Sequence, residues 1–510
     1  FLTKRSLYLL VIDSRKEHFH LDYWLNIIEL LSEKSPILIV KNELENRTVA
    51  INEAPLRERF ENLQNKNLAT NLGNPQGGSG LETIKKAIKY HISELPHIGT
   101  SLAKTWIKVR NALEQNDQNY ISLDDYFRIC EQNGYQRRAD SETDNRLILS
   151  QYFHDLGVIL HFQDNQTSPL YKTVILKPKW GTDAAYKVLD NLQVKQNLGK
   201  FTTADLNHIW QDAEYQNMQA ELLELMQEFK LCYPLPNARN TYIAPQLLEN
   251  KQTDYPWDTA NNLLLRYEYD FMPRGILSRF IVEMHHFIDE PNVWKSGVLL
   301  KRDNTWAEVI ETYDRREIKI RLSGSNKRGF LEVITDQLDE IHDSFKQLRV
   351  KKLIPCNCDV CKNSQNPHFY DLNKLRERLA NRREDIDCDK PPYNPVKVLS
   401  LIDDIGNRDK LIYAPKEHER LDTHTTNYIF NAPIQDLDLL HSEHGNNTMI
   451  EKSPDPKPVK VKSAWANGSF YLFVFVVVVA GIGFLGKQLD FIVLCVVIIA
   501  GVLFVPLIGA

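Results

Sequence analysis

The sequence predicts a multidomain protein of mixed α/β and α+β class that ends in a two-helix transmembrane hairpin. Close to the N-terminus, apolar runs at residues 6–13 and 35–41 flank an amphipathic stretch at residues 22–33. Continuously apolar strands separated by a helix are typical of a parallel sheet. Residues 296–324 instead alternate apolar and polar side chains in three runs, which predicts antiparallel strands. The C-terminal part holds two long uncharged apolar stretches, which predict the hairpin.

The composition argues against a nucleic-acid-binding protein. Among 510 residues, 62 are Lys or Arg and 67 are Asp or Glu, so the formal net charge is -5 at pH 7. A basic excess or stripe of the kind that neutralises phosphates is therefore missing from the sequence, and we expect no nucleic acid as a partner. The length allows about two to four domains of ~100–200 residues each.

The soluble part divides into three units and a tether. We place an α/β unit at residues 1–94. Residues 95–250 follow as amphipathic helices with a few short strand-like runs, which suggests a winged-helix module. An α+β unit occupies residues 251–398, with the three alternating strands, a helix from Lys327 and a cysteine cluster. Residues 399–464 are rich in Pro, Asn and Asp, as expected of a tether, and the hairpin is placed at 465–510.

The two apolar stretches suggest a membrane anchor. Residues 465–485 and 491–508 contain no charged side chain, and each is long enough to cross a hydrocarbon core of ~30 Å at about 1.5 Å per residue. The intervening turn is short, so both ends would face the same side. Lysines precede the first stretch, which predicts that the soluble domains are cytoplasmic. Because neither stretch carries an ionisable side chain, we expect an anchor rather than a transport path.

The cysteines suggest a reducing compartment and a metal site. Seven cysteines in so long a chain do not resemble a secreted disulfide framework. Four of them cluster, namely Cys356, Cys358, Cys361 and Cys388. Three sulfurs in a C-x-C-x-x-C knuckle and a fourth ligand suit the tetrahedral preference of zinc. Cys388 is the first choice for the fourth ligand and His368 the second. Such a closed site would be structural, and four unligated thiols are the alternative.

Several stretches, in their order along the chain, resemble the COR domain that follows the Ras-like Roc domain in Roco proteins. They include LAKTWIKVR (102–110), YISLDDYF (120–127), LSQYFHDLGVILHF (149–162), TVILKPKW, TYIAPQLL, YEYDFMPRGILSRFIVEMH and VWKSGVLL. The resemblance covers roughly residues 1–398. It identifies residues 1–94 as the C-terminal part of Roc, with a partial Ras-like parallel sheet. Residues 95–250 become the winged-helix-like part of COR and residues 251–398 its antiparallel α+β part.

The resemblance implies that Roc binds and hydrolyses GTP, that COR pairs two chains, and that pairing is coupled to the nucleotide cycle. The phosphate loop, the magnesium ligands and the switch segments would precede Phe1. We therefore expect GTP or GDP as a ligand of the intact protein only, and an inactive GTPase in this chain alone. No residue is assigned a catalytic role. The expected whole is a membrane-anchored signalling protein that forms homodimers through COR, with unknown signalling partners.

One segment matches the guanine-binding motif of Ras-like domains imperfectly. In that family the strand ends in Asn-Lys-x-Asp, whose Asp pairs with the guanine edge. Here the matching positions run from Asn42 to Glu45, and Glu43 stands where the family has Lys. Glu45 could still accept hydrogen bonds from guanine, but an anion at Glu43 disfavours a polyphosphate ligand. Asn42 and Glu45 are thus candidates for a weak guanine site, and a turn capped by Asn42 is the alternative.

Three residues are candidates for coupling the Roc-like half to COR, namely Trp106, Arg110 and Tyr152. The reason is that aromatic and Arg side chains dominate buried contacts. Two other functions remain open. The chain could be a fragment of a Roco serine/threonine kinase, although it contains no H-R-D or D-F-G text. It could also be a membrane scaffold without nucleotide switching.

Overall fold

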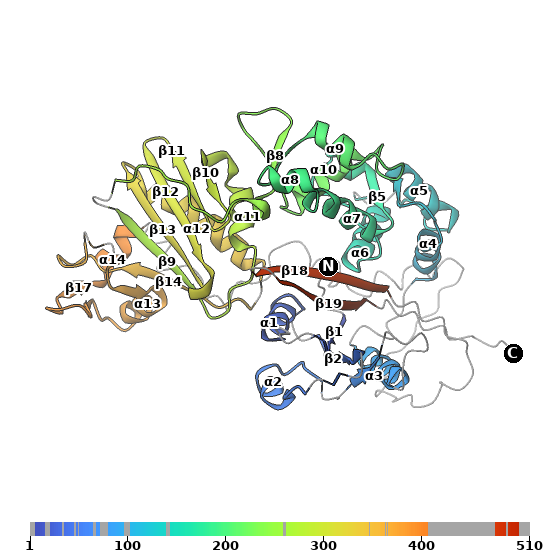
Figure 1. The fold of residues 1–510 in the computed structure, drawn as a ribbon, viewed down its shortest axis with the longest axis horizontal. Helices are drawn as coiled ribbons and strands as arrows, with labels where there is room; N and C mark the ends of the chain where they lie inside the picture. Colours follow the sequence, from blue (N-terminus) through green and yellow to red (C-terminus); the bar gives the residue numbers. More distant parts are fainter. Residues whose placement is uncertain are drawn as a thin grey trace, which may run out of the picture.

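The computed structural model describes most of the chain up to Ile405 and two strands near the C-terminus. The described residues are 6–15, 21–32, 35–44, 47–48, 50–64, 68–71, 80–95, 103–138, 143–258, 262–345, 347–362, 364, 366–405, 475–485 and 488–498. Figure 1 shows three units in chain order, coloured blue, green and yellow to orange. Most of the expected tether, residues 406–464, lies outside the described residues.

The first unit is a parallel α/β sheet, as the sequence predicted. Its strands β1 (Leu7–Asp13), β2 (Ile37–Asn42) and β3 (Leu68–Thr70) are parallel neighbours, and its helices are α1 (Leu21–Ser32), α2 (Glu53–Arg59) and α3 (Leu81–Ser93). Successive side chains of β1 point to opposite faces. Tyr8 and Leu10 belong to the core shared with α1, whereas Leu7 and Leu9 belong to the core shared with α3. Both faces of the sheet are therefore covered, which explains the continuously apolar strands.

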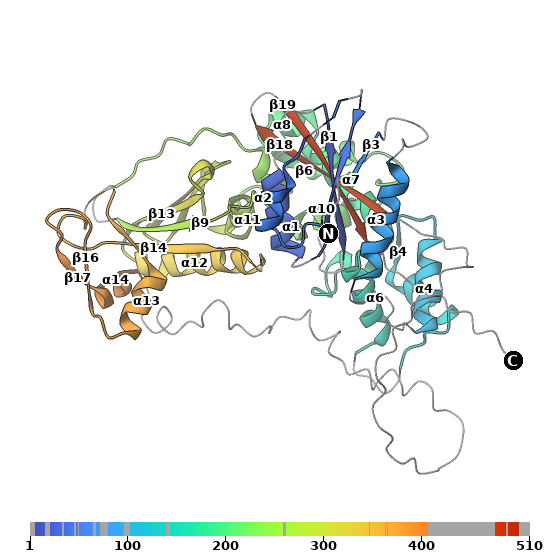
Figure 2. The same cartoon turned by 90° about the horizontal axis from the view of Figure 1, so that it is seen from below.

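The predicted transmembrane hairpin is wrong. The structure forms strands β18 (Phe475–Leu485) and β19 (Gln488–Ile498), and β19 pairs antiparallel with β1 to extend the first sheet. Figure 2 shows both strands, in red, beside β1. Within the described ranges, no helix combines the length and apolar character needed to cross a membrane. The expected multi-pass membrane localisation is corrected with it.

The physical reason for this error is that an uncharged apolar run is compatible with both conformations. Residues 476–479 are four consecutive valines, and β-branched side chains favour strands. Periodicity alone cannot distinguish a buried strand from a buried helix in such text. Residues 465–474 and 499–510, which were also assigned to the hairpin, lie outside the described part of the chain.

The second unit is mainly helical and contains two hydrophobic cores. The first core joins α4, α5 and α6, and the second surrounds the fully buried Trp210. A three-stranded antiparallel sheet of order β6-β8-β7 lies beside helices α7 to α10. The elements are α4 (Lys104–Glu114), β4 (Tyr120–Ser122), α5 (Leu123–Gln132), α6 (Asn145–Asp155), β5 (Thr173–Ile175), α7 (Pro178–Leu189), α8 (Leu192–Gln196), β6 (Lys200–Thr202), α9 (Thr203–Ile209), α10 (Gln219–Glu228), β7 (Tyr233–Pro234) and β8 (Thr241–Ile243).

The third unit is a seven-stranded antiparallel sheet of order β10-β11-β12-β13-β9-β14-β15. Helices α11 (Ile276–Glu283) and α12 (Lys327–Asp343) pack on it, and the core includes Phe280, Phe330 and Ile334. The strands are β9 (Leu263–Tyr269), β10 (Ile288–Trp294), β11 (Gly297–Arg302), β12 (Thr305–Thr312), β13 (Glu317–Gly324), β14 (Val350–Pro355) and β15 (Phe369–Asp371). The three predicted alternating strands are confirmed as β11, β12 and β13, and the predicted helix from Lys327 is confirmed as α12.

A smaller lobe follows β14. We call residues 356–397 the C-terminal lobe. It holds β15, α13 (Leu372–Ala380) and the two short strands β16 (Asp385–Asp387) and β17 (Pro395–Lys397). Helix α14 (Val398–Ile405) then runs across the expected start of the tether, and its Leu401 and Ile402 are buried in the core of the third unit.

Candidate functional site

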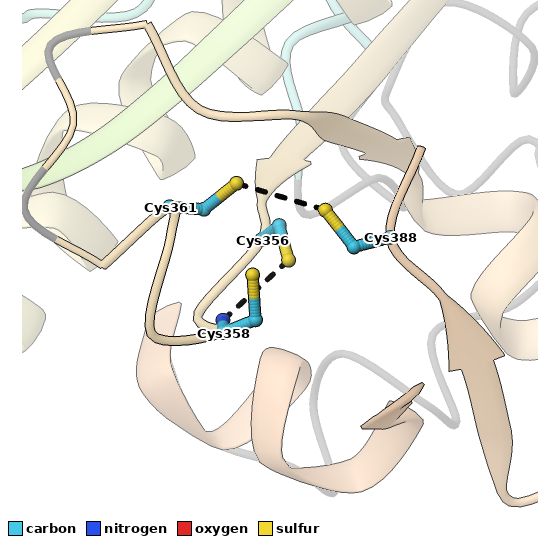
Figure 3. Close-up of side chains that lie close together, drawn as sticks. All are labelled: Cys356, Cys358, Cys361 and Cys388. Atoms are coloured by element: carbon cyan, nitrogen blue, oxygen red, sulfur yellow. Dashed lines mark hydrogen bonds between the residues drawn. The ribbon is translucent and has the colours of Figure 1, made fainter. Parts of the chain in front are cut away.

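The four clustered cysteines converge in the C-terminal lobe. Cys356, Cys358 and Cys361 lie in the loop that leaves β14, and Cys388 lies between β16 and β17. Their sulfur atoms all lie within 4.8 Å of one another. Figure 3 shows the four side chains pointing toward one another. The Cys361 and Cys388 sulfurs are 3.7 Å apart, much farther than the ~2.05 Å of a disulfide. Four sulfurs at ~2.3 Å from one zinc ion in a tetrahedron would be about 3.8 Å apart.

The surroundings of the cluster suit thiolate ligands. Cys356, Cys361 and Cys388 are buried, and Cys358 is partly exposed. Three backbone N–H groups donate towards the sulfurs: Cys358 to Cys356 at 3.5 Å, His368 to Cys361 at 3.4 Å and Lys390 to Cys388 at 3.4 Å. The Tyr370 hydroxyl also donates to the Cys356 sulfur, at 3.6 Å. Such donors favour the charged form of a thiol and orient the ligands of a metal.

The pKa values of these thiols shift in different directions. Burial raises the pKa of Cys356 to about 12, and burial also raises that of Cys361. Burial alone would raise the pKa of Cys358. Hydrogen bonds with the Cys356 side chain and with the backbone of Cys361 lower this pKa by a larger amount, so the net shift is downward. A bound dication deprotonates coordinating thiols, so the donor set is chemically suited to a soft divalent metal.

His368, the second choice for the fourth ligand, has a different role. Its backbone N–H donates to Cys361, and its carbonyl accepts from the Cys356 N–H at 2.7 Å. Its ring stacks edge-on against Tyr370, and Nε2 lies 3.5 Å from the Asp389 carboxylate. The structure therefore brings Cys388, and not the His368 ring, together with the knuckle sulfurs.

The degenerate guanine motif is described only in part. Asn42 is the last residue of β2 and lies between Asp13 of β1 and Thr70 of β3. Its carbonyl accepts from the Ser14 N–H at 3.1 Å, and the next residue, Glu43, donates to the Thr70 carbonyl. Asn42 is thus at the carboxyl edge of the parallel sheet, where ligands of open α/β sheets bind. Glu45 lies outside the described residues.

The three residues predicted to couple the two halves lie together in the second unit. The rings of Trp106 and Tyr152 are 5.2 Å apart, and both pack against the core formed by α4, α5 and α6. The Arg110 guanidinium forms an ion pair with Glu114, one helical turn away. The contacts described for them stay within this unit, so their coupling role remains a prediction.

A contact between the first and third units was not predicted from the sequence. Tyr23 of α1 lies 5.7 Å, ring to ring, from Phe271 in the loop between β9 and α11. The Arg274 guanidinium lies 5.6 Å from the Tyr23 ring and 5.4 Å from the Tyr313 ring. Burial raises the pKa of Tyr23. In both views α1 lies on the side of the first unit that faces the third unit (Figures 1 and 2). Aromatic and Arg side chains often dominate buried contacts, and this contact consists of such side chains. No local sequence pattern connects Tyr23 with Phe271, because they are far apart in the sequence.

Comparisons with known proteins identify the second and third units. A family model described as "C-terminal of Roc, COR-A domain" matches residues 103–248, and one described as "C-terminal of Roc, COR-B domain" matches residues 260–404. The chain is 27% identical over 375 residues to a Roc-COR-CHAT protease of Runella zeae, covering 69% of this chain and 38% of that protein. It is 20% identical over 444 residues to cyclic GMP-binding protein C of Dictyostelium discoideum, covering 76% and 16%.

A solved structure also matches. It is Methanosarcina barkeri Roco2 RocCORdC bound to GDP, with 29% identity, a TM-score of 0.39, and coverage of 49% of this chain and 74% of that one. The chain spans only 38% of the protease and 16% of the cyclic GMP-binding protein. The two COR models match more than half of the chain, in the order in which the motifs resemble COR. The resemblance is thereby confirmed, and this chain belongs to the Roco family.

Proposed function

We propose that this chain couples guanine-nucleotide binding in a complete Roc domain to the COR units of two paired chains. The observation that carries the proposal is the contact of Tyr23, on the Roc-like unit, with Phe271 in COR-B. Helix α1 packs on the parallel sheet through the buried Leu25 and Ile28. That sheet ends in Asn42, the candidate guanine contact. A change at the nucleotide edge therefore has a short route through α1 to COR-B.

The proposed ligand is GTP or GDP in the intact protein. Asn42 and Glu45 would contact the guanine edge, and Glu43 would weaken the site because an anion near a polyphosphate is repelled. GTP hydrolysis is proposed for the intact protein only, and no residue of this chain is given a catalytic role.

The proposed assembly is a homodimer formed through COR. Family membership supports it, because pairing through COR is what the resemblance implies. Within each chain, Trp106, Arg110 and Tyr152 stay candidates for transmitting the change through COR-A. The Tyr23 and Phe271 contact adds a second route, through COR-B.

Phe271→Ala tests the contact between Tyr23 and Phe271. Removing this ring leaves Tyr23 with the neighbouring Trp24 ring but without its aromatic contact to COR-B, so α1 should open more readily. We expect amide hydrogen exchange in residues 21–32 of the full chain to accelerate roughly tenfold. In the intact protein we expect the rate of GDP dissociation to change as well. Tyr393→Ala is the control, because Tyr393 lies in the C-terminal lobe and is 59% exposed. Unchanged exchange in α1 would contradict the proposed coupling through α1 to COR-B.

The four-cysteine cluster is proposed to hold one structural Zn²⁺ ion, separate from the nucleotide site. The sulfur spacing, the burial and the N–H donors described above support this choice. A closed set of four protein ligands leaves no open position for chemistry. Zinc would therefore stabilise COR-B without entering the nucleotide cycle.

A further inference from the structure

We infer that zinc binding at the four cysteines folds the C-terminal lobe of COR-B, and that metal loss releases this lobe while the rest of the COR-B sheet stays folded. The inference rests on the proposed zinc ion, and it adds a consequence for the architecture. The metal would be a clasp between two chain segments, the knuckle after β14 and the turn that holds Cys388.

The elements of this lobe are short. Strands β16 and β17, of three residues each, form a separate two-stranded sheet, β15 adds three residues at the edge of the large sheet, and α13 has nine residues. Two-stranded sheets and helices of this length are marginal in water without further support. By contrast, β12 and β13 have eight residues each and α12 has seventeen. The remainder of COR-B is therefore better able to hold its fold.

Cysteines make up a large part of the lobe's interior. Its buried side chains include Cys356, Cys361 and Cys388, which stand where a larger domain would place apolar side chains. The other buried hydrophobic side chains described in residues 356–397 are Tyr370, Leu372, Leu375 and Val396. Small units with little core rely on disulfides or metals, and the binding free energy of a structural zinc ion is folding free energy.

Hydrogen bonds near the sulfurs also connect the two segments. The Cys388 N–H donates to the Asn394 carbonyl at 3.0 Å, which closes the turn between β16 and β17. The Tyr370 oxygen lies 3.6 Å from the Cys356 sulfur and 3.2 Å from the Asp387 carbonyl, and its one hydrogen can be donated to either acceptor. Tyr370 therefore contacts both of the segments that the metal would join.

The test uses the full chain, purified with zinc and compared with the same chain after chelation. Zinc is quantified per chain, and amide hydrogen exchange is followed in residues 372–380 and, as an internal reference, in residues 327–343. We expect about one zinc per chain. After chelation we expect exchange in residues 372–380 to accelerate roughly tenfold or more, with little change in residues 327–343. Returning Zn²⁺ should restore the protection.

Cysteine variants separate ligand loss from the effects of the chelator. Cys388→Ala should lose zinc and reproduce the exchange pattern of the chelated chain. Cys232→Ala is the matched control, since Cys232 is fully buried outside the cluster, and it should keep both zinc and protection. Protection of residues 372–380 without metal would overturn the inference that zinc folds the C-terminal lobe, but it would leave the zinc proposal intact. A chain that binds no zinc would overturn both, and equal loss of protection in residues 327–343 would overturn the selective release.

Discussion

Glu311, near the end of β12, is a half-buried residue with a buried Oε1 atom, close to the contact between α1 and COR-B. Its Oε1 atom has no hydrogen-bond partner among the described residues. Burial raises the pKa of Glu311 to about 7, while the nearby charge of Arg274 lowers it. The folded state therefore holds a proton on this group more tightly than the unfolded state does. Arg274 also lies over Tyr23 and Tyr313, so the charge of Glu311 bears on the same contact.

The pH dependence of stability follows from this raised pKa. Between the unfolded value near 4.5 and the folded value of about 7, the native chain binds more protons than the unfolded chain. Stability contributed by this group is thus lost as the pH rises through that window. Glu311→Gln should remove the loss. We expect the variant to gain on the order of 1–3 kcal/mol over the native chain at pH 8, and little at pH 4.5. Denaturant unfolding at both pH values measures this, and a difference independent of pH would refute it.

Helix α9 of the second unit shows how local sequence sets element boundaries. Helix α9 begins with a capping box, in which the Thr202 hydroxyl accepts from the Asp205 N–H and the Asp205 carboxylate accepts from the Thr202 N–H. These two bonds satisfy backbone donors that the first turn leaves free. The cap also fixes the end of β6, because Thr202 is its last residue.

Thr202→Ala should therefore weaken both α9 and the three-stranded sheet that contains β6. Loss of the cap is expected to lower the free energy of unfolding by about 1 kcal/mol. Thr202→Ser keeps the hydroxyl and should recover most of that loss. Thermal or denaturant unfolding of the two variants, side by side, measures the difference. Equal destabilisation by both would mean that the methyl group of Thr202, and not its cap, carries the effect.

The elements that the sequence predicted well are those whose signal is local. Alternation in residues 296–324 predicted three antiparallel strands, which the structure forms as β11, β12 and β13. The transmembrane hairpin failed because its valines suit a strand, and the partner of β19 is β1, at the other end of the chain. The contact between Tyr23 and Phe271 was also not predicted, because the two residues are far apart in the sequence. The cysteine set could be found because thiols at knuckle spacing are informative wherever the chain goes.

For the whole molecule, the family implies a pair of chains. The chain mass is 59.3 kDa, so light scattering coupled to size exclusion should report about twice that value if COR pairs two copies. Dilution should lower the apparent mass, because pairing depends on concentration. The measurement uses the full chain without nucleotide. A mass of one chain at every concentration would count against pairing by this chain alone.

Strand β14 joins two features of COR-B that are otherwise separate. At its start, Val350 pairs with Tyr269, and the preceding Arg349 carbonyl accepts from Asp270, the neighbour of Phe271. At its end, Pro355 leads directly into Cys356. A one-residue insertion or deletion in β14 would turn the following side chains to the opposite face of the sheet. It would displace the first cysteine if the pairing at Val350 is kept, or the loop against α1 if the position of Cys356 is kept. The length of this strand is thus constrained from both ends, because it sets the distance between the four-cysteine cluster and the loop that contacts α1.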